Sequence, residues 1–194
     1  EAYDKHESWF RGSELSDEDF KKMRRDYPEV VGLDCTMVLD AKLKSGEIIG
    51  KVRIAPRGFR DHTDKGKWYS TSPTAAAISV RISEMLGMKW GMQGYVFDIS
   101  DAFFSGELLR EDEYMYIKVP KQILEIEGSD PRYPWRRLRR EVPGCKGASS
   151  SWFRVFSRKL IEWGFEQTTT DPALFVKRDS HGTPVAILPI HVDD

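Results

Sequence analysis

The sequence has no long hydrophobic run and only two cysteines among its 194 residues. No apolar stretch approaches the roughly 18 residues of a membrane-spanning helix, and no signal-peptide pattern opens the chain. Cys35 and Cys145 lie far apart, without a partner at zinc or redox spacing. We therefore expect an intracellular protein that is not secreted, has no membrane partner and keeps both thiols reduced.

An excess of charge of one sign is also absent, because 30 basic residues face 31 acidic ones and the net charge is −1. Overall charge therefore gives no sign of polyanion binding. The distribution is uneven, however: residues 132–159 contain nine basic residues and one acid, Glu141, a local charge of +8. For the arginines in 136–140 two interpretations stay open, a face that follows a phosphate backbone or an ordinary solvated face.

What is present is the composition of a folded domain, with 40% hydrophobic, 31% charged and 12% aromatic residues. Ser16 followed by Asp19 resembles a capping box and predicts a helix that Pro28 ends. Thr74 opens a second predicted helix, which Gly87 is placed to end.

Strand patterns alternate with these helices. Residues 36–44 and 47–54 predict a hairpin, and 173–177 with 185–192 predict a second, antiparallel hairpin. The apolar run Gly94–Ile99 predicts a buried strand with one acid near its end. Further predicted elements are strands at 114–119 and 135–142 and a helix at about 149–163. The expected fold class is α+β, with helices packed on one face of a mostly antiparallel sheet.

Three carboxylates carry the chemistry. Asp98 lies inside an apolar run, and Asp193 with Asp194 follows another. Like charges crowded in apolar surroundings are costly unless a cation neutralises them, and carboxylate oxygens suit Mg²⁺. Two such ions about 3.5–4 Å apart can activate a hydroxyl and stabilise a leaving pyrophosphate. The alternative is that these are ordinary strand-end acids facing solvent.

Seven blocks of sequence occur in order along the chain. They are KVRIAPRGF (51–59), TSPTAAAISVR (71–81), FDISDAFFSGEL (97–108), EYMYIKVP (113–120), RRLRREVPGCKGASSSWF (136–153), GFEQTTTDPALFVKR (164–178) and ILPIHVDD (187–194). The ordered set resembles the reverse transcriptase of copia-type long-terminal-repeat retrotransposons. The resemblance implies an N-terminal segment, 1–33, with one short helix, and a reverse transcriptase domain, 34–194, formed by polymerase fingers and a partial palm.

The same resemblance implies roles for single residues. Those roles are catalysis and metal binding for Asp98, Asp193 and Asp194, nucleotide binding for Arg53, Asp101, Ala102 and Phe103, and template–primer binding for Lys146 and Gly147. Phe103 would be a steric gate against a 2′-hydroxyl, since a ring beneath the sugar leaves no room for it. A purely structural role for Phe103 stays open, and for Phe104 a core role is preferred.

The implied activity is that of an enzyme, an RNA-directed DNA polymerase that uses two Mg²⁺ ions, with Mn²⁺ as an alternative. Its partners would be an RNA or DNA template with primer, deoxynucleoside triphosphates and the remainder of a Pol polyprotein (thumb, ribonuclease H and integrase), in a cytoplasmic particle or the nucleus. Because the chain starts without methionine and stops at Asp194, we expect a fragment that is inactive in isolation. The alternatives are a decayed or domesticated remnant that at most binds nucleic acid, and a metal-dependent nuclease.

Overall fold

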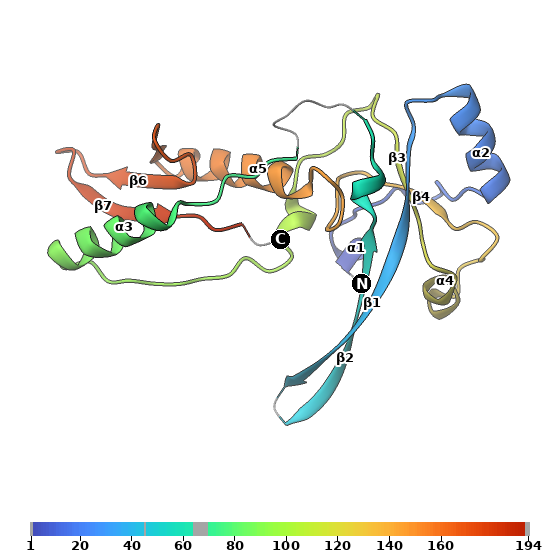
Figure 1. Cartoon of the computed structure of the whole chain (residues 1–194), viewed down its shortest axis with the longest axis horizontal. Helices are drawn as coiled ribbons and strands as arrows, with labels where there is room; N and C mark the ends of the chain where they lie inside the picture. The colour runs from blue at the N-terminus through green and yellow to red at the C-terminus, as the bar shows by residue number, and fades with distance from the viewer. Residues whose placement is uncertain (1, 45, 64–69, 193–194) are drawn as a thin grey trace.

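The computed structural model describes residues 2–44, 46–63 and 70–192, which form two β-sheets with helices around them (Figure 1). The first sheet has the strand order β2-β1-β3-β4 and the second β5-β6-β7. All neighbouring pairs are antiparallel except β1 and β3, which are parallel. The strands are β1 (Val31–Lys44), β2 (Glu47–Pro56), β3 (Met115–Lys118), β4 (Trp135–Arg137), β5 (Phe165–Gln167), β6 (Leu174–Arg178) and β7 (Pro184–Pro189).

Short helices surround the first sheet, and two longer helices lie beside the second (Figure 1). The helices are α1 (Ala2–Lys5), α2 (Asp17–Asp26), α3 (Ala77–Lys89), α4 (Lys121–Glu127) and α5 (Ala148–Glu162), with 3-10 turns η1 (Gly58–Arg60) and η2 (Ala102–Ser105). Among the described residues, none of these helices is long and apolar enough to cross a membrane.

The first sheet separates two layers of apolar packing. Leu33 of β1 and Ile117 of β3 are fully buried in the main core on one face. On the other face Phe20 of α2 stacks on Trp135 of β4, with ring centroids 3.7 Å apart. Side chains alternate across a strand, so the residue before Leu33 faces α2. That residue is Gly32, where a Cβ would collide with the Phe20 ring.

A second core lies between α5 and the sheet β5-β6-β7. Trp152 and Phe153 of α5 are buried against the fully buried Phe175 of β6 and against Ile190, which follows β7. Phe103 of η2 packs against both cores and so joins them.

Residues 2–15, which we call the N-terminal arm, belong to the same packed unit. Tyr3 is buried in the main core, and Trp9 forms an antiparallel backbone bridge with Leu138. The predicted boundary after residue 33 lies within β1, and Tyr3, Val31 and Leu33 belong to the same core as residues from later in the chain.

Predictions that rest on local signals are confirmed. Ser16 caps α2 by accepting a hydrogen bond of 3.1 Å from the N–H of Asp19. Both hairpins are present as β1–β2 and β6–β7. Cys35 and Cys145 are free.

The predicted buried strand at 94–99 is wrong. These residues are extended but make no backbone hydrogen bond to another described residue, and Val96 and Phe97 are exposed, Phe97 by 61%. An apolar run becomes a strand only where a neighbouring strand supplies hydrogen bonds, and no described strand lies against it.

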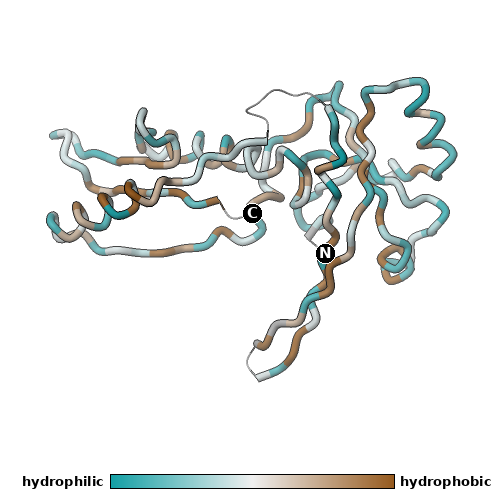
Figure 2. Tube along the Cα trace, viewed as in Figure 1, coloured by the Kyte–Doolittle hydropathy of each residue, from teal (hydrophilic) through white to brown (hydrophobic). Residues whose placement is uncertain are grey.

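The other corrections concern extents and sheet architecture. The strands form two sheets, one with a parallel pair, rather than one mostly antiparallel sheet. Gly87 lies inside α3, whose described residues are all at least partly exposed, and Figure 2 shows hydrophobic residues along this helix. The strand predicted at 135–142 is limited to β4, and α1, α4 and β5 were not predicted.

Candidate active site

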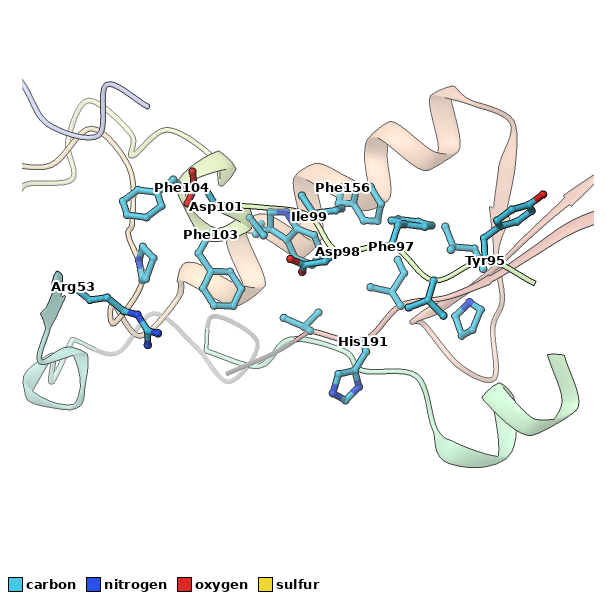
Figure 3. A pocket seen from close by; sticks show the side chains of 18 of the residues that line it. Arg53, Tyr95, Phe97, Asp98, Ile99, Asp101, Phe103, Phe104, Phe156 and His191 are labelled. Carbon is cyan, nitrogen blue, oxygen red and sulfur yellow. The ribbon is translucent and has the colours of Figure 1, made fainter. Parts of the chain in front are cut away.

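A cavity of about 1020 Å³ lies between β2, the segment 95–104 and the end of β7 (Figure 3). It is open to solvent, and its lining includes the aromatic residues Phe97, Phe103, Trp152 and Phe156. Its polar and charged lining residues come from three parts of the chain that are distant in sequence: Lys51, Arg53, Asp98, Asp101 and His191. A mostly apolar cavity with a few convergent charged groups is the usual form of a ligand site.

Asp98 lies on the extended segment before η2 and lines this cavity. Its carboxylate is exposed and makes no hydrogen bond or ion pair with any described residue, so it is available as a ligand. Asp193 and Asp194 lie outside the described residues. Val192, the residue before them, lines the same cavity as Asp98 and is buried.

The described residues do not by themselves form a metal site. Within the part of the chain that the structure describes, no group of three or more His, Cys, Asp or Glu side chains could hold a metal ion. Of the two carboxylates among the described residues that line the cavity, Asp101 is paired and Asp98 has no partner among those residues, so Asp98 supplies a hard-oxygen group of the kind that suits Mg²⁺. A complete donor set therefore requires ligands beyond those that the described residues provide.

The loop of Asp101 to Phe104 is held by its own backbone and by contacts from the N-terminal arm. Asp101 has a left-handed backbone (φ 56°), uncommon for a residue with a side chain, and its carbonyl accepts the 2.9 Å hydrogen bond from Phe104 that starts η2. The Asp101 Oδ2 lies 3.3 Å from His6 Nε2 and 3.2 Å from Lys5 Nζ. Hydrogen bonds from His6 and then Lys5 lower the pKa of Asp101, which favours its ionised form.

Ala102 and Phe103 line the cavity beside Asp98. The Phe103 ring meets Trp152 edge to face, with centroids 6.4 Å apart. Phe103 is half-buried and reaches the cavity, so its ring can both pack and face a ligand. Phe104 is buried in the main core, as preferred from the sequence.

Arg53 also lines the cavity, from β2 (Figure 3). Its guanidinium makes an ion pair of 3.1 Å with Asp40 of β1, and both side chains are about half exposed. Exposed ion pairs contribute little, typically about 0–1 kcal/mol, so Arg53 can exchange this partner for a phosphate at low cost.

Lys146 and Gly147 lie on the turn before α5 and do not line the cavity. Lys146 is exposed, whereas Gly147 is buried. The turn is held against η1, where Gly58 donates a 2.9 Å hydrogen bond to the Gly144 carbonyl.

In the basic stretch 132–159, acids that lie outside the stretch pair with most of the basic residues. Arg136 is buried and pairs with Glu14 at 2.7 Å. Six of the nine basic residues make such pairs; the others are Arg132–Asp130, Arg139–Glu7, Arg154–Glu107, Arg158–Glu107 and Lys159–Glu162. The stretch therefore does not present a bare positive face.

The N-terminal arm contributes groups that sequence reasoning missed. Tyr3 lines the cavity, and Lys5 with His6 holds Asp101. These contacts join residues 95 and 96 positions apart, and no local pattern indicates them.

Comparison with known proteins identifies the family of the chain. A family model described as reverse transcriptase (RNA-dependent DNA polymerase) matches residues 32–194. The chain belongs to this family. It is 25% identical over 173 residues to the retrovirus-related Pol polyprotein from transposon RE2 of Arabidopsis thaliana, an alignment that covers 86% of this chain and 11% of the relative. It is also 25% identical over 165 residues to the retrovirus-related Pol polyprotein from transposon TNT 1-94 of Nicotiana tabacum, covering 84% and 12%.

The relatives support a copia-type reverse transcriptase region. The chain spans about a tenth of the length of the curated relatives that it matches. No solved structure matches it.

Proposed function

We propose that this reverse transcriptase region forms the fingers and part of the palm of an RNA-directed DNA polymerase. In this proposal the cavity takes a deoxynucleoside triphosphate against the end of a primer annealed to a template. The observation that carries the proposal is the convergence of Asp98, the loop 101–103 and Arg53 on one cavity. The two sequence blocks that contain these residues, 51–59 and 97–108, are separated along the chain and meet at this cavity.

In this proposal the residues contact the triphosphate and the sugar of the nucleotide. Arg53 offers a planar, permanently charged fork that suits phosphate oxygens. Asp101 and Ala102 line the cavity at the start of η2, and in this proposal their backbone N–H groups would meet the triphosphate. Phe103, fixed by Trp152, would lie beneath the sugar and exclude a 2′-hydroxyl. These contacts bind and orient the nucleotide, which is most of what a protein supplies in phosphoryl transfer.

Asp98 would hold metal together with Asp193 and Asp194. When bound, two Mg²⁺ ions, or Mn²⁺, would activate the primer 3′-hydroxyl and neutralise charge on the leaving pyrophosphate. The availability of the Asp98 carboxylate fits this role, since a ligand already held by a cationic side chain would have to be released first.

The test compares Asp98→Asn with Asp26→Asn, which changes an exposed aspartate on α2 outside the cavity. Binding of dATP to a complex of the chain with an RNA template and DNA primer is measured with and without Mg²⁺. We expect Asp98→Asn alone to abolish the Mg²⁺-dependent part of binding while leaving the melting temperature unchanged. Equal Mg²⁺ dependence in wild type and Asp98→Asn would reject the assigned site.

Primer extension on the same substrate tests the whole activity. We expect extension from a longer polyprotein that contains this region, loss of it on Asp98→Asn, and none from the 194-residue chain alone. Salt-sensitive nucleic-acid binding without any Mg²⁺-dependent nucleotide binding or synthesis would favour a non-enzymatic retroelement remnant instead.

A further inference from the structure

We propose that the N-terminal arm is a working part of the nucleotide subsite, in which Lys5 and His6 are positioning residues that act on the triphosphate through Asp101. This inference rests on the proposed function, because it concerns the same subsite. The arm lies outside the segment that the reverse transcriptase family model matches, which begins at residue 32.

The arm first holds the loop that would meet the triphosphate. Lys5 and His6 both contact Oδ2 of Asp101, and the His6 ring stacks on Phe104 with centroids 5.6 Å apart at an interplanar angle of 17°. A left-handed backbone at a residue other than glycine persists only where its surroundings impose it. The arm contacts both ends of this turn: Lys5 and His6 contact Asp101, and the His6 ring contacts Phe104.

The arm also holds the opposite side of the cavity. The Tyr3 hydroxyl donates a 2.9 Å hydrogen bond to the carbonyl of Ile54, the neighbour of Arg53 on β2. The Tyr3 ring meets Phe104 edge to face at 5.1 Å. One short segment thus connects the strand of Arg53 with the loop of Asp101 and sets the space between them.

The arm is itself fixed to β4 and the residues after it. Arg139 pairs with Glu7 at 2.8 Å, and its N–H donates a 2.8 Å hydrogen bond to the carbonyl of Ser8. The guanidinium of Arg136 lies 5.2 Å from the centroid of the Trp9 ring. Basic residues of the stretch 132–159 are therefore used to anchor the arm.

The charge of Lys5 should also affect the binding of a triphosphate, in addition to holding the loop of Asp101. Asp101 is an ionised carboxylate in a cavity proposed to take a triphosphate, and like charges repel. Lys5 neutralises that carboxylate and places a positive group beside the subsite. The structure therefore predicts that reversing the charge at Lys5 weakens the binding of a triphosphate more than that of an uncharged nucleoside.

The test uses Lys5→Glu, Lys5→Arg and the matched control Lys22→Glu, which makes the same charge change on an exposed face of α2 away from the cavity. Dissociation constants of dATP and deoxyadenosine are measured with Mg²⁺ and an RNA–DNA primer–template. We expect Lys5→Glu to weaken dATP binding by roughly two- to fivefold, as exposed ion pairs of this kind allow, with deoxyadenosine unchanged. Lys5→Arg and Lys22→Glu should stay within about twofold of wild type on the same scale. Equal effects of Lys5→Glu and Lys22→Glu would overturn the inference.

Hydrogen exchange separates this inference from the proposed function, since it needs no nucleotide. Amides of residues 102–106 are compared in wild type, in Lys5→Glu combined with His6→Ala, and in His181→Ala, which changes an exposed histidine in the β6–β7 turn. Faster exchange in the arm variant alone is expected. Unchanged exchange overturns the inference even if dATP binds. If the wild type binds no dATP, the proposed function fails, and exchange still decides whether the arm holds the loop.

Discussion

Gly58 packs closely against the backbone of the turn at 144–146. We expect Gly58→Ala to destabilise the fold, because the added methyl group would collide with that backbone. A Cβ built there would lie 2.7 Å from the backbone nitrogen of Lys146 and still closer to the carbonyl oxygen of Gly144. Both atoms belong to backbone, which cannot rotate away as a side chain can. Gly144 is equally confined, because its own Cβ would lie 2.6 Å from the carbonyl oxygen of Pro56.

The size of the effect follows from two opposing contributions. Forcing an extra carbon into packed surroundings costs about 1–3 kcal/mol, and rigid backbone on the far side favours the upper half of that range. Replacing glycine by alanine restricts the unfolded chain, which returns about 0.4–1 kcal/mol. We therefore expect a net loss of roughly 1–2.5 kcal/mol, or a fall in melting temperature of about 2–10 °C for a chain of this length.

Urea denaturation followed by circular dichroism measures the change, with Gly50→Ala as the control. Gly50 lies on β2, and Gly58 lies two residues after the end of this strand. Unlike at Gly58, nothing lies within 4 Å of a Cβ built at Gly50. The control should be neutral or slightly stabilising, since glycine weakens a strand interior. Gly58→Ala at least as stable as Gly50→Ala would refute the argument that close backbone contact requires glycine here.

Three further results are expected. Phe175→Ala should lower the free energy of unfolding by about 3–5 kcal/mol in urea, because this side chain is fully buried in the second core. Hydrogen bonds from Ser79 and two backbone N–H groups hold the pKa of Asp171 below its usual value, so its stabilising contribution is present above the unfolded pKa of about 3.9 and is lost as the pH falls further. The stability advantage of wild type over Asp171→Asn, measured by thermal melts, should therefore shrink below about pH 4. Burial raises the pKa of Cys35 to about 12 and also raises that of Cys145, so iodoacetamide should label neither thiol at pH 7.5 until urea unfolds the chain; rapid labelling of the native protein would contradict this.

Elements set by neighbouring residues could be predicted from the sequence. The cap at Ser16 needs only Asp19, and the hairpin β1–β2 needs only a turn between two strand-like runs. The strand predicted at 94–99 failed because its apolar pattern says nothing about whether a partner strand lies beside it. Composition identifies a segment that can form a strand. Whether that segment joins a sheet depends on a partner strand elsewhere in the chain.

Several members of the candidate site could be predicted from the sequence, whereas the contribution of Tyr3 and the partners of these residues could not. The sequence blocks gave Asp98, Asp101, Phe103 and Arg53, and the structure places all four on one cavity. Pairing of Arg53 with Asp40 and the contacts on Asp101 depend on folding of distant segments. Asp193 and Asp194 remain predictions, since they lie outside the described residues.

The uneven charge of the chain illustrates why contacts between distant segments could not be predicted from the sequence. A stretch of +8 in a sequence of net charge −1 means that acids are concentrated elsewhere. Sequence alone left open either a surface for an external polyanion or a solvated face, and the folded chain brings Glu7 and Glu14 of the N-terminal arm to Arg139 and Arg136. Segregated charges that pair on folding act between distant segments, so they select which parts of the chain meet. Here the ion pairs hold the arm against β4 and the residues after it, and Tyr3 of the arm lines the cavity. The charge pattern therefore helps to determine the geometry of the site. None of those arginines needs to bind a ligand for this effect.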